Sequence, residues 1–372
     1  MTTPTETDRL MLIGQFRNAL ADLYTFERYA WDPQGRLTLT GKLAGPAEEQ
    51  YRAIRSRVEP LGFTPFLRRA AGGADELFAL PIVLERTPQR IWLPLLLFVL
   101  TTLSVLFVGA LNNGADLARA PLSIFDGLPF AATLMSILIT HEFGHYIVGR
   151  WRRAPVSLPY FIPMPITMTG TMGAVIVQRE PLEDRRTTLE VGIAGPLAGL
   201  LVAIPLLIYG IVLSPVGPPP VVGSETGYIQ EGNSILYASI KYLVHGAWLP
   251  GGGVDVQLGQ VAWGAWIGLL VTMLNLLPIG QLDGGHVAYA LLGARARYLS
   301  YAVVAICTVL GVFVSNTWLI WGVLALLLGA KHPPLLNEIT TPRPIHTLLG
   351  AVGLVAFILL FMPDPLRIVT GA

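Results

Sequence analysis

The sequence has few charged residues and almost no cysteine. Asp, Glu, Lys and Arg together make up 13% of the 372 residues, whereas hydrophobic residues make up 53%. Soluble globular proteins carry about 25% charged residues, so most of this chain is expected to lie in a lipid bilayer. The single cysteine, Cys307, excludes an intrachain disulfide bond and a zinc site built from several cysteines. A bound metal ion would therefore need His, Asp or Glu ligands.

The chain also lacks a large net charge of either sign. Its formal net charge of +1 provides no polybasic surface, so we expect no nucleic-acid partner. The N-terminal region contains no uninterrupted apolar segment and carries Glu6 and Asp8, which argues against a signal peptide or an acid-poor transit peptide. Insertion into a membrane is therefore expected to begin at the first long apolar segment.

Long apolar segments are abundant. A helix needs about 20 apolar residues to cross a bilayer, and these segments predict seven membrane-spanning helices, with six as the next most favoured number. The shorter segment at 317–330 is expected to form a tight pair with the segment at 297–314, joined at "SNTW" (315–318). The segments lie near 91–111, 127–149, 188–213, 261–281, 297–314 and 345–363, with the shorter one at 317–330.

Basic residues at the ends of these segments predict their orientation. If the segments alternate in direction, the basic residues gather on one side, which the positive-inside rule identifies as the cytoplasm. The N-terminus is then cytoplasmic, and the 214–260 loop lies outside. The residues that carry this prediction include Arg90, Arg150, Arg152, Arg153, Arg295, Arg297 and Arg343.

Residues 1–85 have a different pattern. "RLTLTGKL" (36–43) alternates with period two, "PAEEQYRAIRSRVEPL" (46–61) is helix-like, and "FTPFLRR" and "ELFALPIVL" flank a glycine-containing turn. We predict a small α+β cytoplasmic domain over 1–85, which could dock a substrate, sense a signal or only cover the membrane part. A transmembrane domain over 86–363, with its core at 127–285, and a short tail at 364–372 complete the predicted polytopic α-helical membrane protein.

The motif with the clearest chemistry is His-Glu-x-x-His, formed by His141, Glu142 and His145. Residues four apart lie on one face of a helix, so one divalent ion can bind both imidazoles. Zinc suits this pair, and a catalytic zinc site takes three protein ligands. Glu142 is adjacent without having to be a ligand, and a carboxylate there can act as the base of peptide hydrolysis. Only six histidines occur in the chain, so this pattern is rarely met by chance.

Asp283 is the predicted third ligand. It lies in "NLLPIGQLDGGH" (275–286), one of the few places where an acidic residue meets an apolar segment at the predicted cytoplasmic boundary. Pro278 lacks a backbone donor, and Gly284 and Gly285 permit non-helical backbone, so the helix is expected to end or unwind here. Unwound backbone at membrane depth is tolerated where it lines a protein cavity. A simple helix kink is the alternative for the proline and glycines.

Two polar residues near Asp283 have two interpretations each. Asn275 could donate to the oxyanion of a tetrahedral intermediate or hold a substrate backbone, or it could form an interhelical hydrogen bond. His286, one turn beyond Asp283, could orient the ligand carboxylate as an outer partner, or it could be purely structural. We expect His141, His145 and Asp283 to be the three protein ligands of one Zn²⁺ per chain.

The stretch "SLPYFIPMPITMTGTMGAVIVQRE" (157–180) is apolar but interrupted by prolines and glycines, so we do not expect it to span the membrane. It could form short strands whose edge pairs with an unwound substrate, or a re-entrant loop that only fills the cavity. In the next segment, Gly195 and Gly199 are four residues apart. This spacing favours close helix packing over a chemical role.

"HEFGH" (141–145) and "NLLPIGQLDGG" (275–285), on different predicted spans, resemble the intramembrane metalloproteases of the site-two protease type. The resemblance covers roughly residues 90–340. It implies that His141, His145 and Asp283 bind zinc, that Glu142 is the base, and that the substrates are single-span or other membrane proteins cleaved in the bilayer. The segment "KHPPLLNEITTPRP" (331–344) is similar to the branch found in bacteria and plastids, which favours a bacterial inner membrane. Many members carry a peptide-binding domain in the outer loop, for which 214–260 is too short.

Two other functions compete with an intramembrane zinc protease. A metal-binding polytopic transporter could use the same histidines, but metal passage has no special need for Glu142 beside the first of them. A catalytically silent membrane chaperone would be expected to have lost one of the four motif residues, and none is lost. The sequence therefore favours the protease.

Overall fold

The computed structural model describes residues 6–70, 72–84, 90–220, 227–329 and 332–370. The chain divides into two compact units. The first unit comprises Met1–Pro88, Gln178–Thr188 and Pro333–Ile345, and the second comprises Gln89–Val177, Leu189–His332 and His346–Ala372. The predicted domain boundary between residues 85 and 86 lies outside the described residues. The first unit thus contains two segments from much later in the chain.

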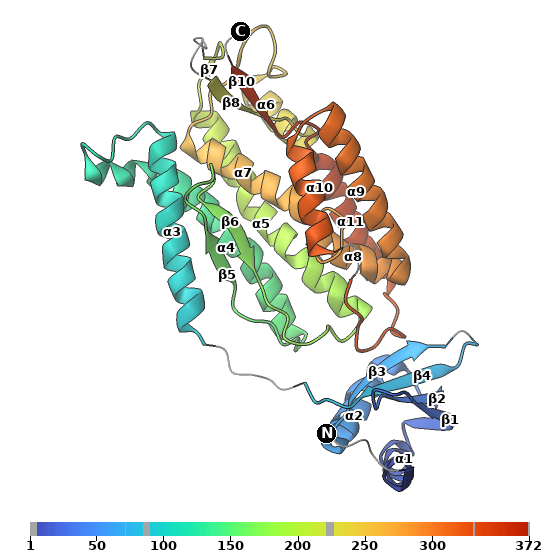
Figure 1. Cartoon of the computed structure of the whole chain (residues 1–372). Coiled ribbons are helices and arrows are strands. Elements are labelled where there is room, and N and C mark those ends of the chain that lie inside the picture. The colour runs from blue at the N-terminus through green and yellow to red at the C-terminus, as the bar shows by residue number, and fades with distance from the viewer. Residues whose placement is uncertain (1–5, 71, 85–89, 221–226, 330–331, 371–372) are drawn as a thin grey trace. The chain divides into compact units, whose positions relative to one another are not determined.

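The first unit is an antiparallel four-stranded sheet with two helices, drawn in blue in Figure 1. Phe16 of the first helix and Tyr51 of the second are fully buried together with Leu39 of the sheet, so both helices pack on a shared apolar core. The strand order is β1-β2-β4-β3. The elements are α1 (Glu6–Leu20), β1 (Tyr24–Trp31), β2 (Leu37–Leu43), α2 (Ala47–Val58), β3 (Thr64–Arg69) and β4 (Asp75–Leu80).

These elements confirm the α+β character predicted from the sequence and add two that were not predicted. The strand expected at 36–43, the helix expected at 46–61 and the two strands around the glycine turn are all present. Helix α1 and strand β1 were not predicted. The signal for α1 was present, because Ile13, Phe16 and Leu20 are spaced by three and four residues and are buried.

The segment Pro333–Ile345 extends this unit beside β3. Leu67 donates to the carbonyl of Leu336 at 2.8 Å and accepts from the amide of Glu338 at 2.9 Å. Asn337 is fully buried, and its side chain donates to Ala47 O and to Thr340 Oγ1 at 3.3 and 2.8 Å. A buried side-chain amide needs such partners, so the "NEIT" sequence anchors this segment.

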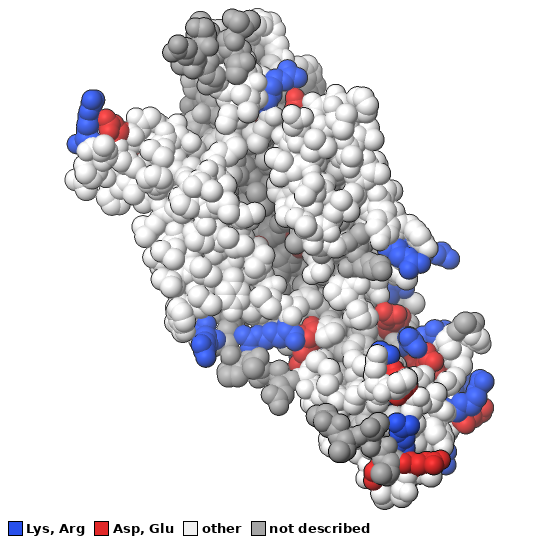
Figure 2. Space-filling view, viewed as in Figure 1, with Lys and Arg blue, Asp and Glu red and all other residues white. Residues whose placement is uncertain are grey.

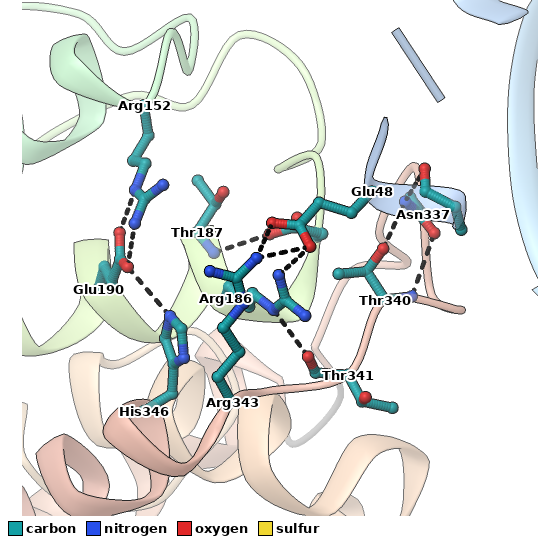
Figure 3. Close-up of polar contacts among 12 residues, drawn as sticks. Glu48, Arg152, Arg186, Thr187, Glu190, Asn337, Thr340, Thr341, Arg343 and His346 are labelled. Atoms are coloured by element: carbon teal, nitrogen blue, oxygen red, sulfur yellow. Dashed lines mark hydrogen bonds and ion pairs between the residues drawn. The ribbon is translucent and has the colours of Figure 1, made fainter. Parts of the chain in front are cut away.

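The second late segment, Gln178–Thr188, also belongs to the first unit. Leu336 and Asn337 donate backbone hydrogen bonds to Leu182 and Glu183. Glu48 on α2 pairs with Arg186 and with Arg343, the latter at 2.9 Å (Figure 3). One carboxylate of the N-terminal sequence thus binds both late segments.

The second unit contains a helix that overlaps each of the predicted apolar segments, although the helix that begins at Gln260 ends at Asn275 rather than near residue 281, and the helices Ile235–His245 and Asp283–Leu292 were not predicted. Four described helices are long and apolar enough to cross a membrane: Trp92–Asn112, Pro121–Trp151, Arg185–Leu213 and Asp283–Phe313. Shorter apolar helices cover Gln260–Asn275, Thr317–Leu327 and Pro344–Leu360. The helices of Figure 1 are α3 (Trp92–Asn112), α4 (Leu128–Trp151), α5 (Arg185–Leu213), α6 (Ile235–His245), α7 (Gln260–Asn275), α8 (Asp283–Leu292), α9 (Ala296–Phe313), α10 (Thr317–Leu328) and α11 (Pro344–Leu360).

The surface of these helices suits lipid. Large apolar side chains on one face of α3 are exposed at spacings of four, which are Leu95, Val99, Leu103 and Phe107. Figure 2 shows this unit with charged side chains near its ends and a largely uncharged surface between them. Soluble proteins rarely expose a row of large apolar side chains along the length of a helix, so the arrangement supports a membrane environment.

Short strand pairs connect the helices. Of the two structures considered for 157–180, short strands are present, as the hairpin of β5 (Tyr160–Pro163) and β6 (Thr171–Val175). At the end of the helices where α7 begins, β7 (Val216–Gly217) pairs with β9 (Asp255–Val256), and β8 (Gly227–Glu231) pairs with β10 (Leu366–Thr370). The C-terminal strand therefore lies at the same end as the loop between α5 and α7.

The chain unwinds where the sequence predicted it. Helix α7 ends at Asn275, residues 276–282 are not helical, and Asp283 begins α8. A Cβ on Gly284 would lie 2.0 Å from the carbonyl oxygen of Leu276, so only glycine allows α8 to start against this turn. The break places an acidic residue at the first turn of a helix beside α4 and α5.

Candidate metal centre

Three side chains from two helices converge in the second unit. His141 and His145 of α4 are 2% and 8% exposed. The Nε2 atoms of the two histidines are 3.2 Å apart, and each lies within 3.3 Å of an oxygen of Asp283. These are the three residues that the sequence predicted as ligands, and among the described residues they form the group able to hold a metal ion.

The geometry of this group fits zinc. Ligand atoms about 2.0–2.1 Å from a tetrahedral zinc ion lie about 3.3–3.4 Å from one another. The three observed separations of 3.2, 3.2 and 3.3 Å are close to those edges. Two imidazoles and a carboxylate are a donor set of catalytic zinc sites, which leave a fourth position for water or substrate.

A backbone carbonyl orients His145. The Nδ1 atom of His145 donates to the carbonyl oxygen of Val191 on α5 at 2.7 Å. This bond requires the proton on Nδ1, which leaves the lone pair of Nε2 directed at the other two ligands. The sequence did not identify Val191, because a backbone acceptor has no side-chain signature.

Two glycines let α5 approach the histidines. A Cβ on Gly195 would lie 2.1 Å from His145 Nε2, and one on Gly199 would lie 3.3 Å from His141 Cβ. The sequence favoured a packing role for these glycines, and they do pack. Their neighbours are the two predicted ligands, so this packing determines the space available at the metal centre.

Glu142 and Asn275 lie in the same region. Glu142 is 5% exposed and makes no hydrogen bond or ion pair with the described part of the chain. Asn275 Nδ2, at the end of α7, lies 3.3 Å from His141 Nε2. An amide so close to a ligand atom can reach a group that binds there, as the oxyanion interpretation requires.

His286 contacts a second histidine. Its Nδ1 atom lies 2.6 Å from Nε2 of His332, whose ring stacks on Tyr289. Gly192 of α5 lies close to this residue, since a Cβ there would be 2.8 Å from His286 Cβ. The structure therefore brings His286 to His332, which the sequence did not single out.

A second polar cluster lies on α5 one residue before Val191. The Glu190 carboxylate accepts from Nε and Nη2 of Arg152, the residue that follows α4 (Figure 3). It also pairs with His346 Nε2 of α11 at 3.0 Å. The side chains of Glu190 and His346 are 14% and 5% exposed, so the cluster joins α4, α5 and α11 in a largely buried environment.

The hairpin β5–β6 is held by α3. The hydroxyl of Ser104 on α3 donates to the carbonyl of Gly170 in the hairpin loop at 2.6 Å. Gly170 has a φ of 75°, and a Cβ there would lie 2.7 Å from the Cα of Val105. The close approach fixes the hairpin against α3, and strands β5 and β6 pair with each other alone among the described strands.

Comparison with known proteins agrees with this geometry. The model of Peptidase family M50 matches residues 129–317, which include the three converging side chains and Glu142. The probable zinc metalloprotease EGY2, chloroplastic, of Arabidopsis thaliana is 29% identical over 98% of this chain and 66% of its own length. The protein of the same name from Oryza sativa subsp. indica is 26% identical over 89% of this chain and 62% of its own length.

A third relative is the probable zinc metalloprotease EGY1, chloroplastic, of Arabidopsis thaliana, which is 31% identical over 63% of this chain and 43% of its own length. The chain thus spans two thirds or less of the length of these curated relatives. No solved structure matches.

Proposed function

The chain belongs to peptidase family M50, and we propose that it is a zinc metalloendopeptidase that hydrolyses peptide bonds within or near membrane-spanning segments of other membrane proteins. One observation carries the proposal: His141, His145 and Asp283 converge with zinc-like spacing beside the buried Glu142. Relatives named as probable zinc metalloproteases support it, and the chain itself is an integral membrane protein.

Each residue of the centre has a proposed role. His141, His145 and Asp283 would hold one zinc ion, which supplies Lewis-acid chemistry by polarising a carbonyl and acidifying water. Glu142 accepts the proton of the attacking water and delivers it to the leaving amine. Asn275 donates to the substrate carbonyl oxygen as it becomes negative. Pro278, Gly284 and Gly285 keep residues 276–282 unwound, so that Asp283 reaches the histidines.

The alternatives are less well supported. Neither a metal transporter nor a silent chaperone requires an acidic residue between two metal ligands, and the curated relatives are named for proteolysis. In this proposal His286 has a structural role through its contact with His332, since His286 Nδ1 and His332 Nε2 are 2.6 Å apart.

We further propose seven membrane-spanning helices, α3, α4, α5, α7, α9, α10 and α11, with the N-terminus and the metal centre on the cytoplasmic side of a bacterial-type inner membrane. The basic residues Arg150, Arg152 and Arg153 follow the helix that carries the histidines, which supports this orientation under the positive-inside rule. The domain over 1–85 is then cytoplasmic, and strand β10, which lies in the predicted tail 364–372, is on the outer side.

The proposed substrates are single-span or other membrane proteins, held in part by β5 or β6. An extended segment can add to the free edge of a two-stranded hairpin through main-chain hydrogen bonds, largely independent of sequence. This suits an enzyme that must unwind a helix before cleaving it.

The decisive experiment compares two variants of the purified full chain. Glu142→Gln should retain one zinc per chain but lose cleavage of a membrane-protein substrate by a factor of about 10²–10⁴, the usual contribution of a general base. The double variant His141→Ala/His145→Ala should lose the zinc as well. Unchanged zinc content in the double variant would overturn the site, and full cleavage by Glu142→Gln would overturn the mechanism. The Glu142→Gln protein can also trap substrates in native membranes for identification by mass spectrometry.

A further inference from the structure

The second unit contains a cavity of about 850 Å³ away from the metal centre. It lies at the end of the helices that carries the loop between α5 and α7, and none of the proposed zinc ligands lines it. Ligand sites usually measure about 300–1,000 Å³, so the cavity is large enough for a bound segment of polypeptide. The end of α3, the start of α4, the loop between β5 and β6, strands β7, β8 and β9, and the start of α7 form its wall.

The edge of strand β8 borders this cavity. Four consecutive residues of β8, Tyr228 to Glu231, line it. Side chains of a strand alternate between two faces, and the lining includes consecutive residues of β8 but none of β10, which points to the edge of β8 opposite β10 as the one that borders the cavity. Among the described strands, β8 pairs only with β10. Its other edge can therefore hydrogen-bond to an extended chain placed in the cavity.

The charged residues that line the described wall are acidic. Glu231 and Asp255 line the cavity, and the described lining residues include no Lys, Arg or His. Behind them, the fully buried Lys241 lies 3.0 Å from Asp255, and Tyr237 donates to Glu231 at 3.0 Å. One ammonium group faces two carboxylates, and burial raises the pKa of Glu231 above its usual range. A cation in the cavity would supply the missing positive charge.

The helix α7 connects this cavity to the metal centre. Its first residue, Gln260, lines the cavity, and its last residue, Asn275, lies 3.3 Å from His141 Nε2. At 1.5 Å per residue these ends are about 22 Å apart. A substrate helix that runs beside α7 would therefore place about 15 residues between a group in the cavity and the scissile bond.

We propose that the cavity binds the substrate segment that adjoins its membrane-spanning helix on the outer side, as an extended strand beside β8 with one ammonium group against Glu231 and Asp255. The inference rests on the proposed protease function and orientation. The ammonium group comes from a lysine side chain or from a free amino terminus, two sources with the same chemistry at this wall.

Peptide binding to the full-length Glu142→Gln chain in detergent micelles tests the inference without requiring cleavage. The probes are three heptapeptides with the same Val/Thr sequence and a fluorophore at the C-terminus. One is acetylated with a central lysine, one is acetylated with a central glutamine, and one has a free amino terminus with the central glutamine. The lysine peptide, the peptide with a free amino terminus, or both should bind about tenfold or more tightly than the acetylated glutamine peptide. The peptide that binds more tightly shows whether the ammonium group comes from a lysine side chain or from an amino terminus.

Two further substitutions locate the binding. Glu231→Gln, added to Glu142→Gln, should remove the preference for the ammonium peptide while leaving zinc content unchanged, which reports that the fold is intact. Asp116→Asn, which removes an exposed carboxylate of the loop between α3 and α4, should leave the preference unchanged. Equal affinity for all three peptides, or a preference that survives Glu231→Gln, would overturn the inference.

Cleavage by the unsubstituted chain is measured separately. If that chain cleaves no membrane protein while Glu142→Gln still prefers ammonium peptides, the protease function fails and the cavity assignment stands as a peptide site. If cleavage proceeds but no peptide preference exists, the cavity assignment alone fails.

Discussion

At the level of single residues, Gly195 determines whether α5 can lie beside the metal-binding histidines. Any side chain there would occupy the position of the His145 ring, because a Cβ would lie 2.1 Å from Nε2. Neither α4 nor α5 can give way easily, since Gly144 of α4 also packs directly on Ala194 and Ala198 of α5.

Gly195→Ala should therefore lose zinc and proteolysis, although alanine favours a helix over glycine by about 1 kcal/mol. Gly199→Ala is the matched control, because its Cβ would lie 3.3 Å from the nearest His141 atom and small shifts relieve the contact. Metal analysis and cleavage of both variants check the prediction. Full zinc content in Gly195→Ala would show that the ring has another position available.

The residue scale also shows what the sequence can and cannot predict. His141, His145 and Asp283 could be predicted as a group because their chemistry is rare in an apolar chain and glycine and proline mark the unwound turn. The Val191 carbonyl, the His286–His332 contact and the buried Asn337 could not. They depend on which distant segments meet, and local pattern does not contain that information.

Among the secondary-structure elements, α5 organises the surroundings of the metal centre. It provides the Val191 carbonyl and, one residue earlier, the Glu190 carboxylate that holds Arg152 and His346. Bidentate arginine–carboxylate pairs are strong and directional. Glu190 thus fixes the end of α4 and the start of α11 relative to the turn of α5 that orients His145.

Glu190→Gln should weaken this arrangement without removing a ligand. The loss of charged hydrogen bonds is expected to destabilise the unit by about 1–3 kcal/mol, and zinc affinity should fall by about tenfold, as for other outer partners of metal ligands. Glu183→Gln is the control, because its pair with Arg52 is more exposed and exposed pairs contribute about 0–1 kcal/mol. Competition with a chelator measures the affinity. Equal zinc affinity in Glu190→Gln and the parent would contradict this role.

For the whole molecule, the proposed orientation can be tested at the end of α4. Trp151 is exposed and follows His145 by six residues. In a Cys307→Ser background, Trp151→Cys should react with a membrane-impermeant thiol reagent only when the cytoplasmic side is accessible. Labelling from the outer side alone would show that every helix has the opposite orientation to the one proposed.

The proposed function also predicts which substrates are cleaved. A helical peptide bond is shielded by its own hydrogen bonds, and the enzyme must bind an extended segment. Gly and Pro weaken a helix by about 1 and 3 kcal/mol relative to Ala, so substrates should carry such residues in the cytoplasmic half of their span. Replacing them with Leu in a trapped substrate should slow cleavage at equal expression and insertion, and restoring one Gly should recover it. Identical rates across the series would mean that another feature selects substrates.

The composition of the first unit has a consequence for biosynthesis. Its sheet is encoded before residue 85, but its Asn337 anchor and the partners Arg186 and Arg343 of Glu48 are translated far later. During synthesis Glu48 therefore lacks Arg186 until α3 and α4 have been made, and the β3 edge lacks Leu336 and Glu338 until all the described membrane helices except α11 have been made. A chain that stops before residue 333 would leave that edge open, and an unpaired strand edge can pair with the edge of another chain and promote aggregation.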